Sequence, residues 1–333
     1  MSEGAEPRTV GELGEFALID RINAGRADAP AVLLGPGDDA ALVAAPDGRF
    51  VVSTDMLVQG RHFRLDWSSP RDVGRKAIAQ NAADVVAMGA APTAFTVALG
   101  CPSDTPLAVI DGLAEGLWSA ATDLGASVAG GDLVRSADLV ISVTAFGDLC
   151  GRAPITRSGA REGDTVAVAG RLGWSAAGLA VLSAEAGADR FADAVAAHRV
   201  PRPPYAAVLD LPAAGARPTA LTDVSDGLLA DLGHIARASG VRVDLDSAAL
   251  GDPALESIAA ALDADAAQWI LAGGEEHAFA ATWPSGVRPP AGWLVIGRVC
   301  AGHGVTVDGV AHSGSLGWES FDGAGSAGES EPR

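Results

Sequence analysis

Short apolar runs alternate with alanine-rich stretches of helical period along most of the chain, and glycine ends several of them. Periodicity and these stop signals locate the elements. We expect helices over residues 72–88, 106–124, 175–186 and 227–239, and strands over residues 51–52, 95–99, 139–146, 165–169 and 241–245. The pattern therefore predicts helices and strands interspersed along the whole chain, without a repeat of fixed period.

At 333 residues the chain is longer than most single domains, which favours two domains. The segment CGRAPITRSGAREGD is rich in glycine, arginine and proline. We place a boundary there, near Cys150, between domains of residues 1–150 and 151–333. Residues 1–9 and a tail from about residue 322 are small, polar or rich in glycine and serine, so we expect them to be disordered.

The formal net charge of −19 at pH 7 limits the classes of partner. Binding to nucleic acid or to an anionic membrane relies on lysine and arginine, so neither partner is expected. Glycines and prolines interrupt the longest uncharged stretch, residues 85–103, which argues against a membrane span. The N-terminus lacks the apolar core of a signal peptide, and the cysteines fit neither a disulfide framework nor a zinc site. We therefore expect a cytoplasmic location. The cysteines are Cys101, Cys150 and Cys300.

Aspartates occur in clusters where glycine, serine or threonine adjoins an apolar run. They are Asp38, Asp39, Asp55, Asp84, Asp132, Asp223 and Asp226. Mg²⁺ prefers oxygen ligands in octahedral geometry and commonly takes a few carboxylates together with substrate phosphates. A chain this acidic has no other evident means of holding a phosphate compound. The pattern therefore predicts a magnesium site that binds phosphates.

The chain has one lysine, Lys76, and no Gly-x-x-x-x-Gly-Lys-Ser/Thr segment. A P-loop is therefore excluded, and the signature motifs of protein kinases are absent as well. Phosphoryl transfer by this chain would have to use another architecture, in which carboxylates hold the metal.

Two of the clusters also fit ordinary turns. Asp38 and Asp39, between glycine and alanine in GPGDDAAL, fit a solvated turn. Residues 53–55, Ser-Thr-Asp, follow a strand-like pair of valines and fit a polar turn at the strand end. Their successive oxygens would equally suit a shared cation. His62, seven residues further on, is a lone histidine, and such residues more often have a structural role.

The other clusters have plain alternatives too. Asp84, three residues after Asn81 on an apolar helix face, fits an ion pair with lysine or arginine. Residues 130–132, Gly-Gly-Asp, offer backbone amides that could approach a phosphate. Residues 223–227, Asp-Val-Ser-Asp-Gly, fit helix N-capping. One cap needs one such side chain, however, and a helix N-terminus also attracts phosphate, so here we favour a binding site.

Taken together, ten segments in order resemble the thiamine-monophosphate kinase family. They are GELGEFALIDRI, GDDAAL, STDMLVQGRHF, NAADVVAMGAAP, GGDLVRS, TRSGAREGD, GRLGWSAAGLAVL, DVSDGLLADLGHI, LAGGEEHAF and LGWESF, from about Gly11 to Phe321. The resemblance implies the two-domain α/β (α+β) fold of the aminoimidazole ribonucleotide synthetase superfamily. It also implies a homodimer whose contacts are made by the N-terminal sheet domain. The implied activity is direct transfer of the ATP γ-phosphoryl group to thiamine monophosphate.

The resemblance also assigns residues. In the family several Mg²⁺ ions are bound at positions that match Asp39, Ser53, Thr54, Asp55, Asp84, Asp132, Asp223 and Asp226. Nucleotide contacts match Gly131, Asp132, Arg157 and Ser225, and contacts to thiamine monophosphate match His62, Glu275 and Trp318. Asp55 and Asp84 would act in catalysis through the metal, and no residue is an evident covalent acceptor.

The residue chemistry agrees with this assignment. Phosphoryl transfer mainly requires in-line positioning and neutralisation of charge. Arg157 suits bidentate contact with a phosphate, and Trp318 offers a flat face to a cationic ring. One departure occurs: the usual Gly-Gly-Glu-Asp-Tyr of the family is replaced here at residues 273–277 by Gly-Gly-Glu-Glu-His. We expect this change to affect the thiamine side and to leave the metal and nucleotide sites untouched.

Relatives in the same superfamily fit less well. Selenophosphate synthetase would need a reactive cysteine near the N-terminus, but the first cysteine here is Cys101. A hydrogenase-maturation protein would end in a functional cysteine, whereas this chain ends in Glu-Pro-Arg. Aminoimidazole ribonucleotide synthetase remains as the alternative enzyme. A silent module that binds Mg²⁺ and nucleotide is the alternative of another class.

Overall fold

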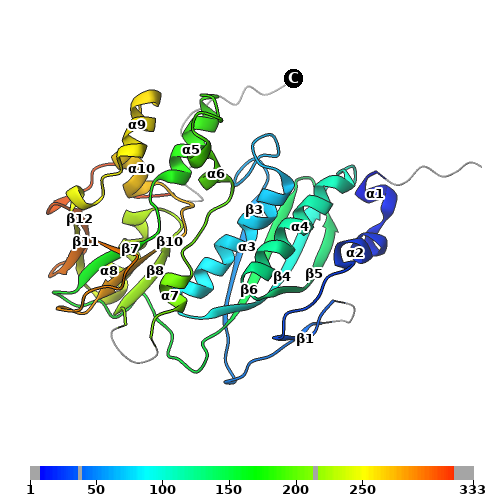
Figure 1. Ribbon diagram of the computed structural model, residues 1–333, viewed down its shortest axis with the longest axis horizontal. Helices are drawn as coiled ribbons and strands as arrows, with labels where there is room; N and C mark the ends of the chain where they lie inside the picture. The colour runs from blue at the N-terminus through cyan, green and yellow to red at the C-terminus, as the bar shows by residue number, and fades with distance from the viewer. Residues whose placement is uncertain (1–7, 37–39, 213–216, 319–333) are drawn as a thin grey trace, which may run out of the picture.

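Two large β-sheets, each packed against helices, dominate the part of the chain that the computed structural model describes, residues 8–36, 40–212 and 217–318 (Figure 1). The strands of the first sheet, in lateral order, are β3 (Val51–Val58), β6 (Val140–Asp148), β4 (Ala91–Cys101) and β5 (Ser127–Arg135). Strand β6 is antiparallel to β3 and β4, whereas β5 is parallel to β4. A parallel pair requires a crossover, and helix α4 (Leu107–Asp123) provides it.

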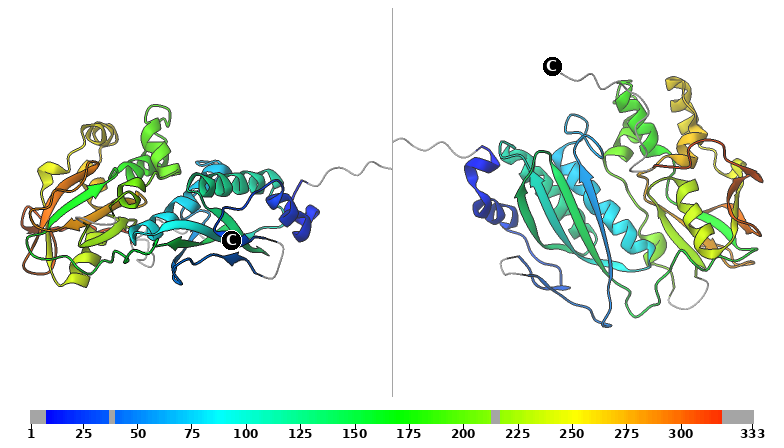
Figure 2. Two further views of the ribbon diagram at one scale, coloured as in Figure 1. Left: turned by 60° about the horizontal axis from the view of Figure 1, so that its bottom comes forward. Right: turned by 180° about the vertical axis from the view of Figure 1, so that it is seen from behind.

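Helices α3 (Pro70–Ala87) and α4 lie on one face of this sheet, which we call the inner face (Figure 2). A Cβ atom at Gly116 would lie 2.1 Å from the carbonyl oxygen of Arg71, and one at Gly74 would lie 2.3 Å from that of Leu113. Glycine at both positions therefore allows the two helix backbones to approach closely.

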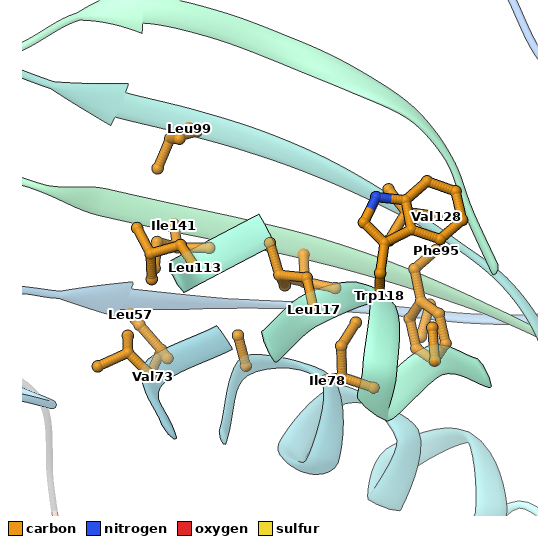
Figure 3. Packing of buried hydrophobic residues seen from close by; sticks show 14 of the residues in the cluster. Leu57, Val73, Ile78, Phe95, Leu99, Leu113, Leu117, Trp118, Val128 and Ile141 are labelled. Carbon is orange, nitrogen blue, oxygen red and sulfur yellow. The ribbon is translucent and has the colours of Figure 1, made fainter. Parts of the chain in front are cut away.

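The core of this half fills the space between the two helices and the inner face (Figure 3). Its labelled members are Leu57, Val73, Ile78, Phe95, Leu99, Leu113, Leu117, Trp118, Val128 and Ile141. Side chains alternate between the two faces of a strand. Ser53 and Asp55 therefore share the inner face with the buried Leu57, while Thr54 and Met56 lie on the opposite, outer face.

The second sheet has seven strands. In lateral order they are β13 (Val310–Ala311), β12 (Gly304–Val307), β9 (Arg242–Leu245), β11 (Trp293–Cys300), β7 (Thr165–Ala169), β10 (Ala278–Trp283) and β8 (Ala220–Val224). The helices of this half are α5 (Trp174–Ser183), α6 (Ala192–Arg199), α7 (Ala206–Leu209), α8 (Leu228–Ser239), the 3₁₀ helix η1 (Ser247–Ala249), α9 (Pro253–Leu262) and α10 (Ala266–Ala272). Strands β7, β8 and β10 are almost wholly buried, so this sheet is covered on both faces there.

Four short elements precede the first sheet. They are α1 (Val10–Leu13), α2 (Glu15–Asn23), β1 (Val32–Leu34) and β2 (Leu42–Val43). Strands β1 and β2 pair with each other, and their side chains cover Ala94 and Ala129 at one end of the first sheet. The rest of the outer face exposes apolar side chains. Val52, Met56 and Val134 are each more than half exposed there.

Every helix and strand expected from the sequence occurs, but several bounds differ. Residues 53–55 were expected to follow a strand, yet they lie inside β3, because β6 pairs with β3 from Val51 to Val58. Residues 130–132 likewise lie inside β5, which pairs with β4 from Ser127 to Arg135. A Cβ atom at Gly131 would lie 1.9 Å from the carbonyl oxygen of Val97, so glycine is needed here for strand packing.

No helix within the described residues combines the length and the apolar composition that crossing a bilayer requires.

Candidate functional site

Four aspartates converge where the two halves of the chain meet, and we call them the inner cluster. Asp55 lies on the inner face of β3, and Asp84 lies in the last turn of α3. Asp223 is near the end of β8, and Asp226 is in the loop before α8. Helix α3 thus brings a carboxylate of the first half against carboxylates of the second. The inner cluster matches four of the predicted metal ligands.

Two neutral side chains hold the carboxylates of the first half in place. The Ser53 hydroxyl donates to Asp84 Oδ2 over 2.6 Å. Asn81 Oδ1 accepts the backbone N–H of Asp55 at 2.9 Å, while its amide group donates to the carbonyl of Ala77 at 2.8 Å. The i, i+3 spacing of Asn81 and Asp84 therefore places both on the side of α3 that faces β3.

The inner cluster carries more negative charge than its surroundings neutralise. Burial, followed by the charge of Asp223, raises the pKa of Asp84 to about 7. Burial is also the largest cause of the raised pKa of Asp55 and Asp226, and Asp223 contributes to both. No lysine or arginine within the described ranges forms an ion pair with Asp84. The ion-pair alternative for Asp84 is therefore wrong.

Mutually repelling, partly buried carboxylates are the donor set that a hard divalent cation binds. Burial weakens solvation of each negative charge, and a bound cation would replace that solvation. Asp55, Asp84, Asp223 and Asp226 are therefore candidate oxygen donors for Mg²⁺. Within the described residues, the ligand atoms that lie within 4.8 Å of one another are those of Asp226, Asp231 and His234.

We expect Mg²⁺ to raise the melting temperature more at pH 8 than at pH 5.5, by about 2 °C or more. Asp84 titrates near pH 3.8 when unfolded and near pH 7 in the fold. Its contribution to stability is therefore full below about pH 4 and is lost as the pH rises toward 7. Above that pH the ionised Asp84 carboxylate destabilises the fold, and a bound cation offsets this destabilisation. Thermal melts in EDTA and in Mg²⁺ at both pH values measure the difference.

The control is Asp84→Asn, which should melt in EDTA with a weaker dependence on pH than the wild type. Equal stabilisation by Mg²⁺ at pH 5.5 and pH 8 would contradict the interpretation.

Two other predicted metal ligands lie on the outer face of the first sheet. The Thr54 hydroxyl donates to the carbonyl oxygen of Val143 at 3.0 Å and accepts from Thr144 at 3.1 Å. Asp132 is exposed on β5, where Leu133 points toward the core. The alternative in which the side chains at residues 53–55 share one cation is therefore wrong, because strand alternation turns the middle side chain to the other face. The predicted ligands fall into an inner and an outer group.

The start of α8 is capped by a residue that sequence reasoning missed. Asp231 Oδ2 accepts the backbone N–H groups of Ser225, Asp226 and Gly227 at 3.0, 3.1 and 3.1 Å. The side chains of Ser225 and Asp226 are therefore not needed to cap α8, and the carboxylate of Asp226 is available for other contacts. The position of Asp231 in the first turn of the helix could have indicated its capping role, but the polar side chains of residues 223–226 are nearer to the helix start and were preferred as caps.

Arg157 and His234 lie beside this loop. Arg157 Nε donates to the Thr222 hydroxyl at 3.2 Å, which places the guanidinium next to β8. Ser239 of α8 binds the neighbouring backbone, donating to the carbonyl oxygen of Arg157 at 3.1 Å. His234, not singled out from the sequence, has a ring nitrogen within 4.8 Å of carboxylate oxygens of Asp226 and Asp231. Burial and the positive charge of Arg157 lower the pKa of His234.

Residues 273–277 reach the inner cluster, which corrects one expectation. His277 Nδ1 lies 3.0 Å from Asp223 Oδ2, and both side chains are buried. Although burial lowers it, the pKa of His277 is raised overall by the hydrogen bond to Asp223. The change from the family pattern therefore touches a predicted metal ligand. Glu276 turns the other way and accepts the backbone N–H of Ser175 at 2.7 Å, at the start of α5.

The three predicted contacts to thiamine monophosphate come from both halves of the chain. His62 follows β3, and Glu275 is in the loop after α10. Trp318 donates its backbone N–H to the carbonyl oxygen of Asp226 at 2.9 Å, and its side chain is 59% exposed. Glu275 donates its backbone N–H to the carbonyl oxygen of Ser225 at 2.7 Å. Backbone carbonyl groups of the loop at residues 225–227 thus hold the backbones of Glu275 and Trp318 in place.

An apolar cavity of about 770 Å³ adjoins the predicted nucleotide contacts Gly131 and Asp132. Helices α2 and α4 line it on one side, with Phe16, Leu117 and Trp118 among the side chains, and β4 and β5 line it on the other. It is large enough for a heteroaromatic ring system. Asp39, the remaining predicted metal ligand, and Asp38 lie outside the described residues.

Comparisons with known proteins agree with this arrangement. Residues 37–149 match the family described as AIR synthase related protein, N-terminal domain, and residues 161–284 match AIR synthase related protein, C-terminal domain. Over 323 residues the sequence is 55% identical to thiamine-monophosphate kinase of Mycobacterium tuberculosis (strain ATCC 25618 / H37Rv), which covers 96% of this chain and 95% of that protein.

Solved structures are similar along nearly the whole chain. The crystal structure of thiamine-monophosphate kinase from Stenotrophomonas maltophilia K279a is 34% identical, covers 90% of this chain and 98% of that one, and superposes with a TM-score of 0.77. A structure of AaThiL complexed with AMPPCP and TMP is 31% identical, covers 96% of this chain and 100% of that one, and gives a TM-score of 0.76. The expected two-domain α/β (α+β) fold class is confirmed by these matches.

Proposed function

The chain belongs to the thiamine-monophosphate kinase family, and we propose that it transfers the γ-phosphoryl group of ATP to thiamine monophosphate, giving thiamine diphosphate. The observation that carries this proposal is the inner cluster, set within a sequence 55% identical to a thiamine-monophosphate kinase along 96% of its length. Four mutually repelling carboxylates, none of which forms an ion pair with lysine or arginine within the described residues, suit a reaction in which metal ions bring two phosphate compounds together.

The proposed metal ligands are divided between the two faces of the first sheet. Asp55, Asp84, Asp223 and Asp226 would bind from the inner cluster, with Ser53 orienting Asp84. Thr54 and Asp132 would contribute from the outer face, and Asp39 is assigned by resemblance alone. Bound Mg²⁺ would supply neutralisation of phosphate charge, which lowers the repulsion between two anionic substrates.

The protein residues would bind and orient the nucleotide. We place the base in the apolar cavity beside Gly131 and Asp132, because that cavity adjoins predicted nucleotide contacts. Arg157, held next to β8 by Thr222, would contact phosphate oxygens. Ser225 has the same role in this proposal through its hydroxyl, because Asp231 already accepts the backbone N–H groups at the start of α8. The transfer then needs no covalent acceptor on the protein.

The acceptor would bind through His62, Glu275 and Trp318. His62 Nδ1 accepts the backbone N–H of Val58 at 3.0 Å, so the other ring nitrogen, Nε2, is available to a ligand. Glu275 offers a carboxylate to a cationic ring. The exposed indole of Trp318 offers an aromatic face.

Other parts of the proposal concern assembly and location. We expect a homodimer formed through the outer face of the first sheet, because Val52, Met56 and Val134 expose apolar surface there. We also expect a division into domains near Cys150, a cytoplasmic location, and no nucleic-acid or membrane partner. The net charge of −19 supports the last point.

Product analysis tests the function directly. Purified protein is mixed with MgATP and thiamine monophosphate, and the products are separated by chromatography. Thiamine diphosphate and ADP should form in equal amounts. A silent Mg²⁺-nucleotide-binding module would bind MgATP and form neither product, and an aminoimidazole ribonucleotide synthetase would leave thiamine monophosphate unchanged. Either of these results would overturn the proposal.

Replacing Trp318 by alanine should raise KM for thiamine monophosphate about ten-fold and leave KM for ATP nearly unchanged. A cation–π contact far from the transferred group stabilises ground and transition states alike, so kcat should change little. Steady-state kinetics with each substrate varied in turn measure both constants. Leu316→Ala is the matched control, since Leu316 is exposed on the same segment but has no aromatic ring. A KM for thiamine monophosphate within about two-fold of wild type would refute the stacking role.

A further inference from the structure

The only lysine of the chain, Lys76, is buried at the junction of the two halves. Its side chain is 3% exposed on α3, and lysine is almost never buried without a partner. The ammonium donates to Glu275 Oε1 at 2.6 Å and to the backbone carbonyl oxygen of His62 at 2.9 Å. One ammonium group thus contacts two of the residues that the proposed function assigns to thiamine monophosphate.

Glu275 is held in an unusual position by these contacts. Its backbone has φ of 63°, in the left-handed region, and its N–H donates to the carbonyl oxygen of Ser225. Glu275 Oε1 receives the Lys76 hydrogen bond, and Oε2 lies 3.4 Å from His198 Nδ1 of α6. Its side chain is still 32% exposed, so part of the carboxylate remains open to a ligand.

The charge of Glu275 depends mainly on Lys76. Burial, the largest effect, raises the pKa of Glu275, but Lys76 and the neighbouring histidines together lower it further, and the pKa is lowered overall. Burial lowers the pKa of His198 to about 4, so that ring is neutral near pH 7. Burial also lowers the pKa of His62, while His277 is paired with another carboxylate. Lys76, which contacts the carboxylate directly, is therefore the cation that contributes most to keeping Glu275 ionised at neutral pH.

We propose that Lys76 is a positioning residue for the acceptor substrate: it orients the Glu275 carboxylate and the His62 backbone so that together they bind the cationic ring of thiamine monophosphate. This inference rests on the proposed function. The proposed ligand is a cationic ring, and the carboxylate that would bind it is that of Glu275, whose Oε2 does not bind Lys76. The two groups that accept from the Lys76 ammonium, Glu275 and His62, are not predicted nucleotide contacts, so binding of the nucleotide should not require Lys76.

The variants Lys76→Met and Lys76→Arg test this assignment. Lys76→Met should raise KM for thiamine monophosphate about ten-fold at pH 7, with KM for ATP changed by less than about two-fold. Its KM for thiamine monophosphate should also fall as the pH rises from 6 to 8.5, because Glu275, deprived of its cation, ionises at higher pH. In the wild type, KM for thiamine monophosphate should be nearly constant over that range. Lys76→Arg should bring both the value of KM and its weak dependence on pH close to those of the wild type.

The matched control is Arg75→Met, which removes a positive charge from the neighbouring position of α3. Arg75 is 38% exposed, and its nearest carboxylate is that of Asp123, at 3.9 Å. Both KM values of this variant should stay near wild type. A merely structural role for Lys76 would lower the melting temperature and change both KM values together, without a new dependence on pH.

A measurement on the wild type covers the case in which Lys76→Met does not fold. Labelling with ¹⁵N-lysine gives a single side-chain ammonium resonance, because Lys76 is the only lysine. Thiamine monophosphate should shift that resonance, and Mg²⁺ with a non-hydrolysable ATP analogue should leave it nearly in place. No shift on addition of thiamine monophosphate, or an unchanged KM and pH profile in Lys76→Met, would overturn the assignment. If wild-type protein forms thiamine diphosphate, such a result leaves the proposed function intact. A wild type that forms none overturns both.

Discussion

Asp84→Asn should lower kcat about a thousand-fold while the protein remains folded. Removing one metal-binding carboxylate takes away charge stabilisation of several kcal/mol, and about 4 kcal/mol corresponds to that factor. Asparagine keeps the shape of the side chain and an oxygen that accepts the Ser53 hydroxyl, now at 2.6 Å from Asp84. Its loss of charge is therefore the main change. Single-turnover rates and thermal melts on the same preparation separate catalysis from folding.

Asp55→Asn should behave in the same way, because Asp55 faces Asp84 from β3 and both carry raised pKa values. Removing either charge also relieves repulsion, so each variant should melt at or above the wild-type temperature in EDTA at pH 8. A structural carboxylate would give the opposite pair of results, namely a lower melting temperature and a near-normal kcat.

Asp72→Asn is the matched control for these variants. Asp72 lies in the first turn of α3, where it accepts hydrogen bonds from Ser69, and it is remote from the inner cluster. The same substitution there should reduce stability by about 0.5–1 kcal/mol through weaker capping and leave kcat near the wild-type value. A similar fall in kcat in Asp72→Asn would show that the effect is not specific to the inner cluster.

The inner cluster could be predicted because each carboxylate lies next to a local signal. Asp84 is polar on an apolar helix face, and Asp223 and Asp226 crowd the start of an amphipathic helix. The face of a strand is harder to predict. Thr54 was grouped with its neighbours, and only the pairing of β3 with β6 shows that its hydroxyl points the other way.

Contacts between distant segments could not be read from the sequence. Lys76 and Glu275 are 199 positions apart, and no pattern of period 2 or 3.6 relates them. The pairing of His277 with Asp223 likewise depends on the register of β10 against β8. Asp231 was within reach of sequence reasoning, but its role depends on the backbone path of residues 225–227, which folds back over its carboxylate.

The predicted metal ligands include more carboxylates, on the inner and outer faces of the first sheet, than one Mg²⁺ ion usually binds. One Mg²⁺ ion carried in with ATP usually takes one or two protein carboxylates together with phosphate oxygens. The inner cluster alone has four, and Asp132 lies on the outer face of β5. With a single ion, some of the buried carboxylates would remain ionised and uncompensated or would keep a proton. Full activity should therefore require further Mg²⁺ ions.

At fixed MgATP, the rate should rise about ten-fold or more as free Mg²⁺ increases from near zero to a saturating excess. This factor corresponds to about 1.4 kcal/mol of transition-state stabilisation, which is modest for a bound divalent ion. The rate is measured at saturating thiamine monophosphate, with KCl adjusted to keep ionic strength constant, because exposed charges such as Asp132 are screened by salt. The same titration on Asp132→Asn should require more free Mg²⁺ to reach half of its maximal rate, since that variant weakens the outer group only. A wild-type rate already saturated when total Mg²⁺ equals ATP would contradict the assignment of these carboxylates to more than one ion.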